Sequence, residues 1–194
     1  MIKESEVKKF FNKLAYKWDS YSVNETAIKF ILDRQDLDKN SFILDVGCGT
    51  GVLIPYYIYR DIAHVDAVDL SDKMIEICRN KFKSEKVSFH CTSILNYDTQ
   101  SRYDLIMIYN ALPHMPEREK LFAHLSKLMK DNGRLVIAHG LSLEKLMEVH
   151  DGVSSEVADN FPALETLEKE LSEKLTVTEV INNDYLFCLT AVKK

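Results

Sequence analysis

Long apolar runs and basic stretches are missing from this 194-residue chain. No apolar run approaches the ~18 residues that span a bilayer, and the first residues lack the apolar core of a signal peptide. Lysine and arginine number 25 against 30 acidic residues, which gives a net charge of −5. This balance argues against a nucleic-acid partner bound through its phosphates. We therefore expect a cytoplasmic protein that neither inserts into a membrane nor binds nucleic acid.

Cysteine is scarce, and its spacing matches no metal motif. The chain has four cysteines without a C-x-x-C pair, and they are most simply free thiols in a reducing compartment. Three histidines of interest, His114, His139 and His150, are far apart in sequence, and no cysteine or acid is suitably spaced to complete a ligand set. We therefore expect no metal site.

What the chain does have is the composition and size of one globular domain. Hydrophobic residues make up 46% and charged residues 28%, as in a typical soluble protein. A chain of this length buries a full core without disulfide or metal support.

Three of the six glycines fall together in residues 42–53, and the rest of the chain is organised around them. Residues 42–46 are mostly apolar, which is typical of a parallel strand buried on both faces. Gly47, Gly49 and Gly51 then allow a tight turn in which backbone N–H groups approach a ligand closely.

This turn has two competing interpretations, a dinucleotide site or a site for S-adenosylmethionine (SAM). A dinucleotide turn of the form G-x-G-x-x-G needs its third glycine at position 52, where this chain has Val52. Asp45, two residues ahead of Gly47, would repel a pyrophosphate, whereas it suits the sulfonium and ammonium groups of SAM. Asp69 ends a second strand 22 residues after Gly47, close to the ~20 at which an acid meets ribose hydroxyls. Both cofactors share the ribose signal, and Asp45 favours SAM.

Four motifs in order resemble the class I SAM-dependent methyltransferases, especially those of ubiquinone and menaquinone biosynthesis. Residues 44–51 match the first motif of that family at every key position, and Asp69 falls where the family holds the ribose. Residues 103–108 resemble its fourth strand, and residues 131–137 resemble the turn into its fifth. The resemblance is good over residues 5–140 and extends to the remainder in general layout.

The resemblance implies a Rossmann-like α/β fold with a doubly wound, seven-stranded sheet, mostly parallel with an antiparallel last strand. It divides one domain, residues 1–194, into an N-terminal helical cap (1–40), a SAM-binding core (41–140), a helical roof before strand six (141–173) and a C-terminal hairpin (174–194). The residue patterns agree, because apolar spacing predicts helices near both ends of the cap and alternation predicts a hairpin around 182–184. They also predict a helix over 51–59 and a strand over 134–139.

The resemblance also implies which residues hold the cofactor. Asp45 and the glycine turn would hold the methionine end and Asp69 the ribose, while Leu70, Met74 and Ile94 would sandwich the adenine. The complete set is Trp18, Tyr21, Asp45, Gly47, Cys48, Gly49, Gly51, Asp69, Leu70, Met74, Ser93, Ile94 and Tyr109.

Four members of this set either suit a second role or depart from the family pattern. Trp18 and Tyr21 belong to an aromatic segment that in the family lies across the cofactor, although they also suit a role at the edge of the core. Ser93 stands where the family usually has an acid that accepts a hydrogen bond from the adenine amino group; its hydroxyl can accept that bond, with the Ile94 backbone or Asp98 as alternatives. Tyr109 also suits a place in the core.

His114, His139 and His150 are the candidate catalytic bases. Histidine titrates near neutral pH, and the first two follow strands, where ligands bind in open α/β sheets. Residues 109–116 resemble the Asn-Ala-x-His-His-Leu stretch of the family, with Pro113 in place of the first histidine and His114 matching the second. For each histidine, a structural role is the alternative.

The sequence thus predicts a SAM-dependent methyltransferase that acts on a small molecule and releases S-adenosylhomocysteine (SAH), as a monomer or homodimer. Three alternatives stay open. They are a NAD-dependent reductase, which Asp45 and Val52 disfavour, a non-catalytic SAM-binding subunit, and a protein or RNA methyltransferase.

Overall fold

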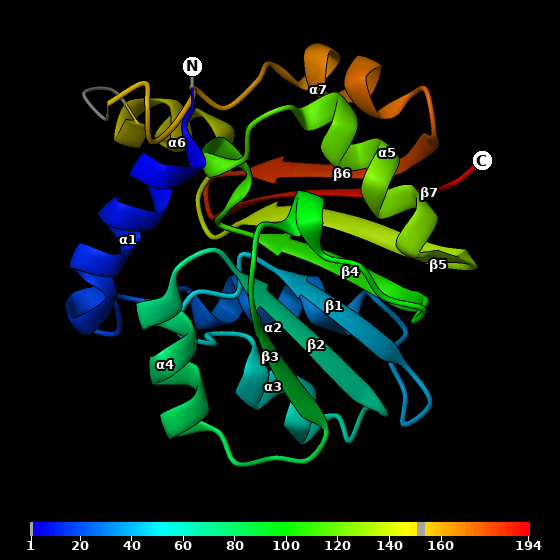
Figure 1. The fold of residues 1–194 in the computed structure, drawn as a ribbon. Coiled ribbons are helices and arrows are strands. Elements are labelled where there is room, and N and C mark those ends of the chain that lie inside the picture. The colour runs from blue at the N-terminus through cyan, green and yellow to red at the C-terminus, as the bar shows by residue number, and fades with distance from the viewer. Residues whose placement is uncertain (1, 151–153) are drawn as a thin grey trace.

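The computed structural model describes residues 2–150 and 154–194, which form one seven-stranded sheet with helices around it (Figure 1). The spatial order of the strands is β3-β2-β1-β4-β5-β7-β6. The strands are β1 (Phe42–Val46), β2 (His64–Asp69), β3 (Val87–Cys91), β4 (Tyr103–Tyr109), β5 (Met129–His139), β6 (Leu175–Asn183) and β7 (Leu186–Lys193). Neighbours from β3 to β5 pair in parallel, and only β7 runs against its two neighbours. The predicted doubly wound sheet with an antiparallel last strand is confirmed.

Helices cover both faces of this sheet. They are α1 (Glu4–Trp18), α2 (Glu25–Asp33), α3 (Ile54–Tyr59), α4 (Asp72–Lys81), α5 (Arg118–Leu128), α6 (Leu143–His150) and α7 (Leu164–Leu171), with short 3-10 turns η1 (Ile94–Asn96) and η2 (Leu112–His114). The apolar sides of α2, α3 and α4 pack in one buried cluster, and those of α5, α6 and α7 pack in a second. The strand order reverses between β1 and β4, because β2 and β3 lie on one side of this pair and β5 lies on the other. In open α/β sheets such a reversal leaves a crevice at the carboxyl ends of the strands.

Polar side-chain caps mark the starts of α2 and α4. The Asn24 side chain accepts a hydrogen bond from the Ala27 backbone N–H at 3.0 Å, and Ser71 does the same for Met74 at 3.1 Å. Each bond satisfies one of the N–H groups that have no partner inside the helix. These caps set α2 and α4 against the sheet at the two sides of the crevice.

Two local expectations differ from the structure. Residues 131–133 do not form a turn before the fifth strand, because β5 already begins at Met129 and takes these residues up as an irregularity in its register with β4. The helix after the glycine turn begins at Ile54 rather than at residue 51, since residues 50–53 remain in turns.

The last two strands form the expected hairpin. The Asn183 side chain accepts hydrogen bonds from the backbone N–H groups of Tyr185 and Leu186, at 2.9 and 3.1 Å, and this fixes the reversal between β6 and β7. Within the described part of the chain, no helix has both the length and the apolar character that crossing a bilayer requires.

Candidate cofactor and acceptor site

A cavity of about 1170 Å³ lies at the carboxyl ends of the central strands, beneath α1. Pockets for one small ligand usually measure ~300–1,000 Å³, so this cavity has room for a cofactor and a second molecule. The predicted residues on its wall are Trp18, Tyr21, Gly47, Cys48, Gly49, Gly51, Asp69, Leu70, Met74, Ser93, Ile94, Tyr109, His114 and His139. The fold thus brings together every predicted site residue except Asp45 and His150. The side chain of His150 lies outside the described part of the structure.

The glycine turn forms the floor of the cavity. Gly47 has φ +70°, and a Cβ there would lie 2.7 Å from the Cβ of Ala111, so a side chain fits neither the backbone nor the space. Gly49 has φ +55°, and a Cβ there would lie 3.5 Å from the indole nitrogen of Trp18. Trp18 therefore lies directly over the turn, as predicted for a residue of the cap.

Asp69, at the end of β2, fastens this turn from the side. Its carboxylate accepts hydrogen bonds from the backbone N–H groups of Gly49 (2.9 Å) and Ser71 (2.8 Å). Burial raises the pKa of Asp69 above its usual range, and these two bonds only partly offset the effect. A half-buried acid on the cavity wall is suitably placed to accept hydroxyl hydrogen bonds.

Asp45 is not on the wall but beneath the turn, where it is 2% exposed. Among the described residues, none hydrogen-bonds to its Oδ2 atom. Burial, and then the negative charge of Asp69, raise its pKa to about 7. Asp45 is therefore a buried carboxylate outside the cavity wall, whereas the resemblance implied that it holds the methionine end of the cofactor.

The cap helix α1 is fastened over the cavity at three points. Near its start, Lys3 pairs with Glu156. In its middle, Asn12 accepts a hydrogen bond from the Ser71 hydroxyl at 2.6 Å and donates one to Asp72. Beyond its end, Asp19 binds the Thr50 hydroxyl and the Lys81 ammonium group. Sequence reasoning missed these contacts because each joins residues that are distant in the chain.

Ser93 and Glu4 meet at the end of the cavity beyond β3. The Ser93 hydroxyl donates a hydrogen bond to Oε1 of Glu4 at 2.5 Å, and both residues are on the wall. Asp98, an alternative partner for adenine in the sequence analysis, is exposed and is not on the wall. The acid at this end therefore comes from α1.

The opposite part of the cavity is more apolar and contains the two described histidines. His114, in η2, has Nδ1 3.1 Å from the carbonyl oxygen of Val157, and its ring packs edge-on against Phe11 at 4.8 Å between centroids. Because a carbonyl only accepts, Nδ1 carries the proton and Nε2 is the basic nitrogen of the neutral ring. His139, the last residue of β5, is 2% exposed and packs edge-on against Phe161.

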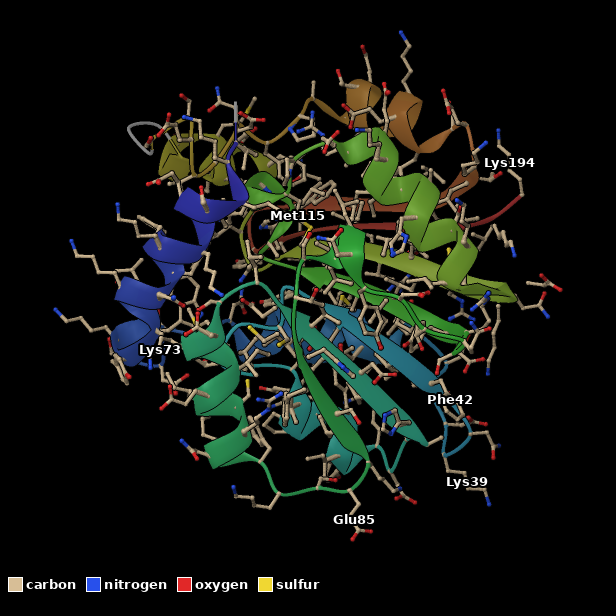
Figure 2. The ribbon with its side chains drawn as sticks, in the orientation of Figure 1. Lys39, Phe42, Lys73, Glu85, Met115 and Lys194 are labelled. Atoms are coloured by element: carbon tan, nitrogen blue, oxygen red, sulfur yellow. The ribbon has the colours of Figure 1, made fainter. Side chains whose placement is uncertain are left out.

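Met115 links the two parts of the cavity. Its methyl carbon would lie 3.3 Å from a Cβ on Gly47, so it reaches the glycine turn from the segment after η2. Figure 2 shows Met115 in the middle of the molecule, whereas Lys39, Glu85 and Lys194 project from the edge. Sequence reasoning missed this position, because a single methionine after a turn has no distinguishing pattern.

The wall between β4 and β5 is held by a small polar network. Asn110, with φ +54°, accepts a hydrogen bond from the Gly140 N–H at 3.0 Å, and Asn24 donates to the Gly140 carbonyl at 3.2 Å. A Cβ on Gly140 would lie 2.7 Å from the Tyr109 hydroxyl, so only glycine fits there. Burial raises the pKa of Tyr109 to about 12. Tyr109 is therefore a neutral hydroxyl that lies both in the core and on the wall.

Metal-binding geometry is not found in the described ranges. Among the side chains of residues 2–148 and 154–194, no three from histidine, cysteine or acidic residues lie close enough together to hold an ion.

Comparison with known proteins finds similarity to methyltransferases. A family model described as a methyltransferase domain matches residues 43–133. The chain is 28% identical over 186 residues to malonyl-[acyl-carrier protein] O-methyltransferase 2 of Ilyobacter polytropus, covering 91% of this chain and 71% of that protein. It is 35% identical over 111 residues to the corresponding enzyme of Acetivibrio thermocellus, covering 55% of this chain and 39% of the relative. It is 29% identical over 146 residues to the ubiquinone biosynthesis O-methyltransferase of Coxiella burnetii, covering 69% of this chain and 61% of that protein. The chain thus spans between about two fifths and about seven tenths of these relatives.

Solved structures show the same fold. Magnesium protoporphyrin IX methyltransferase (ChlM) from Synechocystis PCC 6803 with bound SAH has a TM-score of 0.74 at 17% identity, over 99% of this chain and 100% of that one. The DhpI–SAH complex has a TM-score of 0.78 at 17% identity, over 98% of this chain and 96% of that one. With the ordered motifs and the cavity, these matches support the class I SAM-dependent methyltransferases as the family of this chain and SAM as its cofactor.

The residues around the turn fit this cofactor. SAM carries a sulfonium and an ammonium group, and Asp45 provides a buried carboxylate oxygen with no hydrogen-bond partner among the described residues. A phosphate would meet two acids here, Asp45 and Asp69, in place of the cations that usually bind it. The predicted preference for SAM over a dinucleotide therefore has a structural basis.

Proposed function

We propose that this protein transfers the methyl group of SAM to an oxygen atom of a small, largely apolar acceptor. The observation that carries the proposal is one continuous cavity, whose floor is the acid-flanked glycine turn and whose other wall combines apolar side chains with His114 and His139. The curated relatives described above are named as O-methyltransferases, which supports oxygen as the attacking atom.

The site residues would divide the work between the two parts of the cavity. Gly47–Gly51 and Asp45 would hold the methionine end, Asp69 the ribose, and Leu70, Met74 and Ile94 the base. Bound SAM supplies a methyl group already activated by its sulfonium. The main task of the chain is then to align the acceptor, because an oriented contact of ~3–3.5 Å can account for ~7–11 kcal/mol of a barrier. Phe11 and Met115 are placed to exclude water from that contact.

His114 is our choice for the base, when the acceptor must lose a proton. Its Nδ1 is engaged by the Val157 carbonyl, so Nε2 is the nitrogen that takes the proton. His139 would orient the acceptor from the end of β5. A general base adds ~10²–10⁴-fold for a phenol-type acceptor and little for a carboxylate, which is already ionised at neutral pH.

We also retain the single-domain division of the sequence analysis as a proposal, with the cap at 1–40, the core at 41–140, the roof at 141–173 and the hairpin at 174–194. The three anchors of α1 and the packing of α6 and α7 over the same face of the sheet support it. A monomeric or homodimeric state and a cytoplasmic location stay predictions.

The test is methyl transfer from radiolabelled SAM to a panel of small acceptors containing phenols, carboxylic acids and malonyl thioesters. We expect label in one acceptor class, and none in RNA or in peptide substrates. With a phenol, His114→Asn should lower kcat by ~10²-fold or more and remove the lower limb of the pH profile, while SAH binding stays unchanged. Binding of SAH without transfer to any acceptor would instead favour a non-catalytic subunit.

A further inference from the structure

The acid at the β3 end of the cavity does not come from the sheet. Glu4 is the first residue of α1, 89 positions away from Ser93, yet its Oε1 accepts the Ser93 hydroxyl hydrogen bond at 2.5 Å. Both side chains are on the wall, beside Ile94. Among the described residues, Ser93 is the sole hydrogen-bond partner of the Glu4 side chain, so Oε2 retains its capacity to accept.

Ser93 is itself held in a single orientation. Its Oγ accepts a hydrogen bond from the Leu95 backbone N–H at 3.3 Å as the cap of η1, and its proton is directed to Glu4. The serine hydroxyl therefore positions the carboxylate, and the carboxylate is the acceptor that remains for a ligand. Glu4 is in turn held by the first anchor of α1, where Lys3 pairs with Glu156.

The ligand at this end is the base of the cofactor. On the wall, Asp69 of β2 binds the glycine turn through the Gly49 N–H, and Leu70, Met74 and Ile94 add apolar surface to the same cavity as Ser93. Adenine presents an amino group that donates two hydrogen bonds, and a carboxylate is the strongest acceptor for such a donor. The other charged wall residues are Lys8, Asp19, Asp69 and Lys81, and each has a partner elsewhere.

We propose that Glu4, oriented by Ser93, accepts the hydrogen bond of the adenine amino group and thereby links the cap helix α1 to the identity of the base. This rests on SAM as the cofactor and adds a residue that determines cofactor specificity. In SAM-bound protein the cap helix is then linked to the ligand as well as to α4.

The experiment compares two nucleosides that differ only at this amino group. SAH carries it, and S-inosylhomocysteine carries a carbonyl oxygen that would face the carboxylate. Isothermal titration of the full chain should give at least tenfold tighter binding of SAH. Glu4→Gln should weaken SAH binding by about tenfold and bring the two affinities close together, because an amide can donate to the carbonyl as well as accept from the amine.

Two further variants separate this contact from general effects. Glu6→Gln makes the same change of charge on the same helix but away from the wall, and it should bind both nucleosides as the unmodified chain does. The double variant Glu4→Gln/Ser93→Asp places a carboxylate on the sheet side of the same position and should recover most of the preference for SAH. Hydrogen exchange of residues 4–18 should slow with SAH and much less with S-inosylhomocysteine.

Equal discrimination by Glu4→Gln and the unmodified chain, or an equal loss in Glu6→Gln, would overturn the proposal while the cofactor assignment stands. If the unmodified chain bound neither nucleoside, the cofactor assignment would fail and the proposal with it. Thermal unfolding of each variant, followed by circular dichroism, shows whether the fold is retained.

Discussion

Two buried acids on neighbouring strands have opposite surroundings. Asp66, on β2, accepts a hydrogen bond from the Tyr103 hydroxyl at 2.8 Å and lies 2.7 Å from Nε2 of His90. Burial opposes its ionisation, but the bonds to His90 and Tyr103 outweigh burial and hold its pKa below 3.8. Asp45, on β1, has an oxygen with no such bond among the described residues, and its pKa rises to about 7.

The difference separates a carboxylate that stabilises the fold from one that is available to a ligand. The Asp66 cluster extends through Tyr103 to the hydroxyl of Tyr97 at 3.1 Å, so each charge or dipole there has a partner within the protein. Asp45 lacks one and therefore raises the free energy of the empty protein. We infer that its missing partner is the positive end of the cofactor.

The largest expected effect is that of Asp66→Ala. This change removes the acceptor for Tyr103 and the partner of His90, and each buried group left unpaired costs ~1–3 kcal/mol. The free energy of unfolding should fall by about 3 kcal/mol in urea titrations at pH 7, whereas SAH affinity should remain within about twofold. Asp131→Ala, at a side chain that is 99% exposed, is the matched control and should change stability by less than ~0.5 kcal/mol. A variant that lost SAH binding while keeping its stability would reverse the roles given to the two acids.

Asp45→Asn should show the reverse pattern. Removal of this charge should weaken SAH or SAM binding by ~10–100-fold, the range that a charge-assisted contact of ~1.5–3 kcal/mol provides. The same change should leave the stability of the empty protein at pH 8 unchanged or higher, because it relieves a buried charge beside Asp69. Calorimetric titration and thermal unfolding measure the two quantities. Undiminished affinity would remove Asp45 from the cofactor site.

The smallest expected effects are those of pH on stability and on SAM affinity. Asp66 and Asp45 exert them in different pH ranges. The folded pKa of Asp66 lies below its unfolded value of 3.8, so its contribution is present above pH ~4 and is lost as pH falls through the folded value. The folded pKa of Asp45 is raised, so its contribution is complete below 3.8 and is lost as pH rises to about 7. A bound cation favours ionised Asp45, so SAM affinity should rise with pH up to about 7 and then level off. Asp45→Asn should flatten this rise, and a rise that persisted in that variant would need another titrating group.

The glycine turn was predictable because it is built from consecutive residues. Glycine at positions 47, 49 and 51 can be recognised from spacing alone, and all three have positive φ in the structure. The caps at Asn24 and Ser71 were equally local. Local chemistry of this kind is present in the sequence itself.

The remaining contacts join distant segments, and no pattern along the chain reports them. Glu4 and Ser93 are 89 residues apart, and Tyr103 and Asp66 are 37 apart. The sequence predicted that the fifth strand begins at residue 134, whereas β5 begins at Met129, and tertiary contact again explains the difference. A glycine following Asp131 and Asn132 is typical of a turn, but pairing with β4 keeps these residues within the strand. Tertiary contacts overrode the local preference there.

Trp18 lies over Gly49 and is the only tryptophan in the chain. Its emission is therefore free of signal from any other indole, and it arises directly above the glycine turn that forms the floor of the cavity. Cofactor entry should change the polarity around this one ring, so the unmodified chain carries its own optical reporter. A stopped-flow instrument could then time the arrival of the nucleoside without any added label.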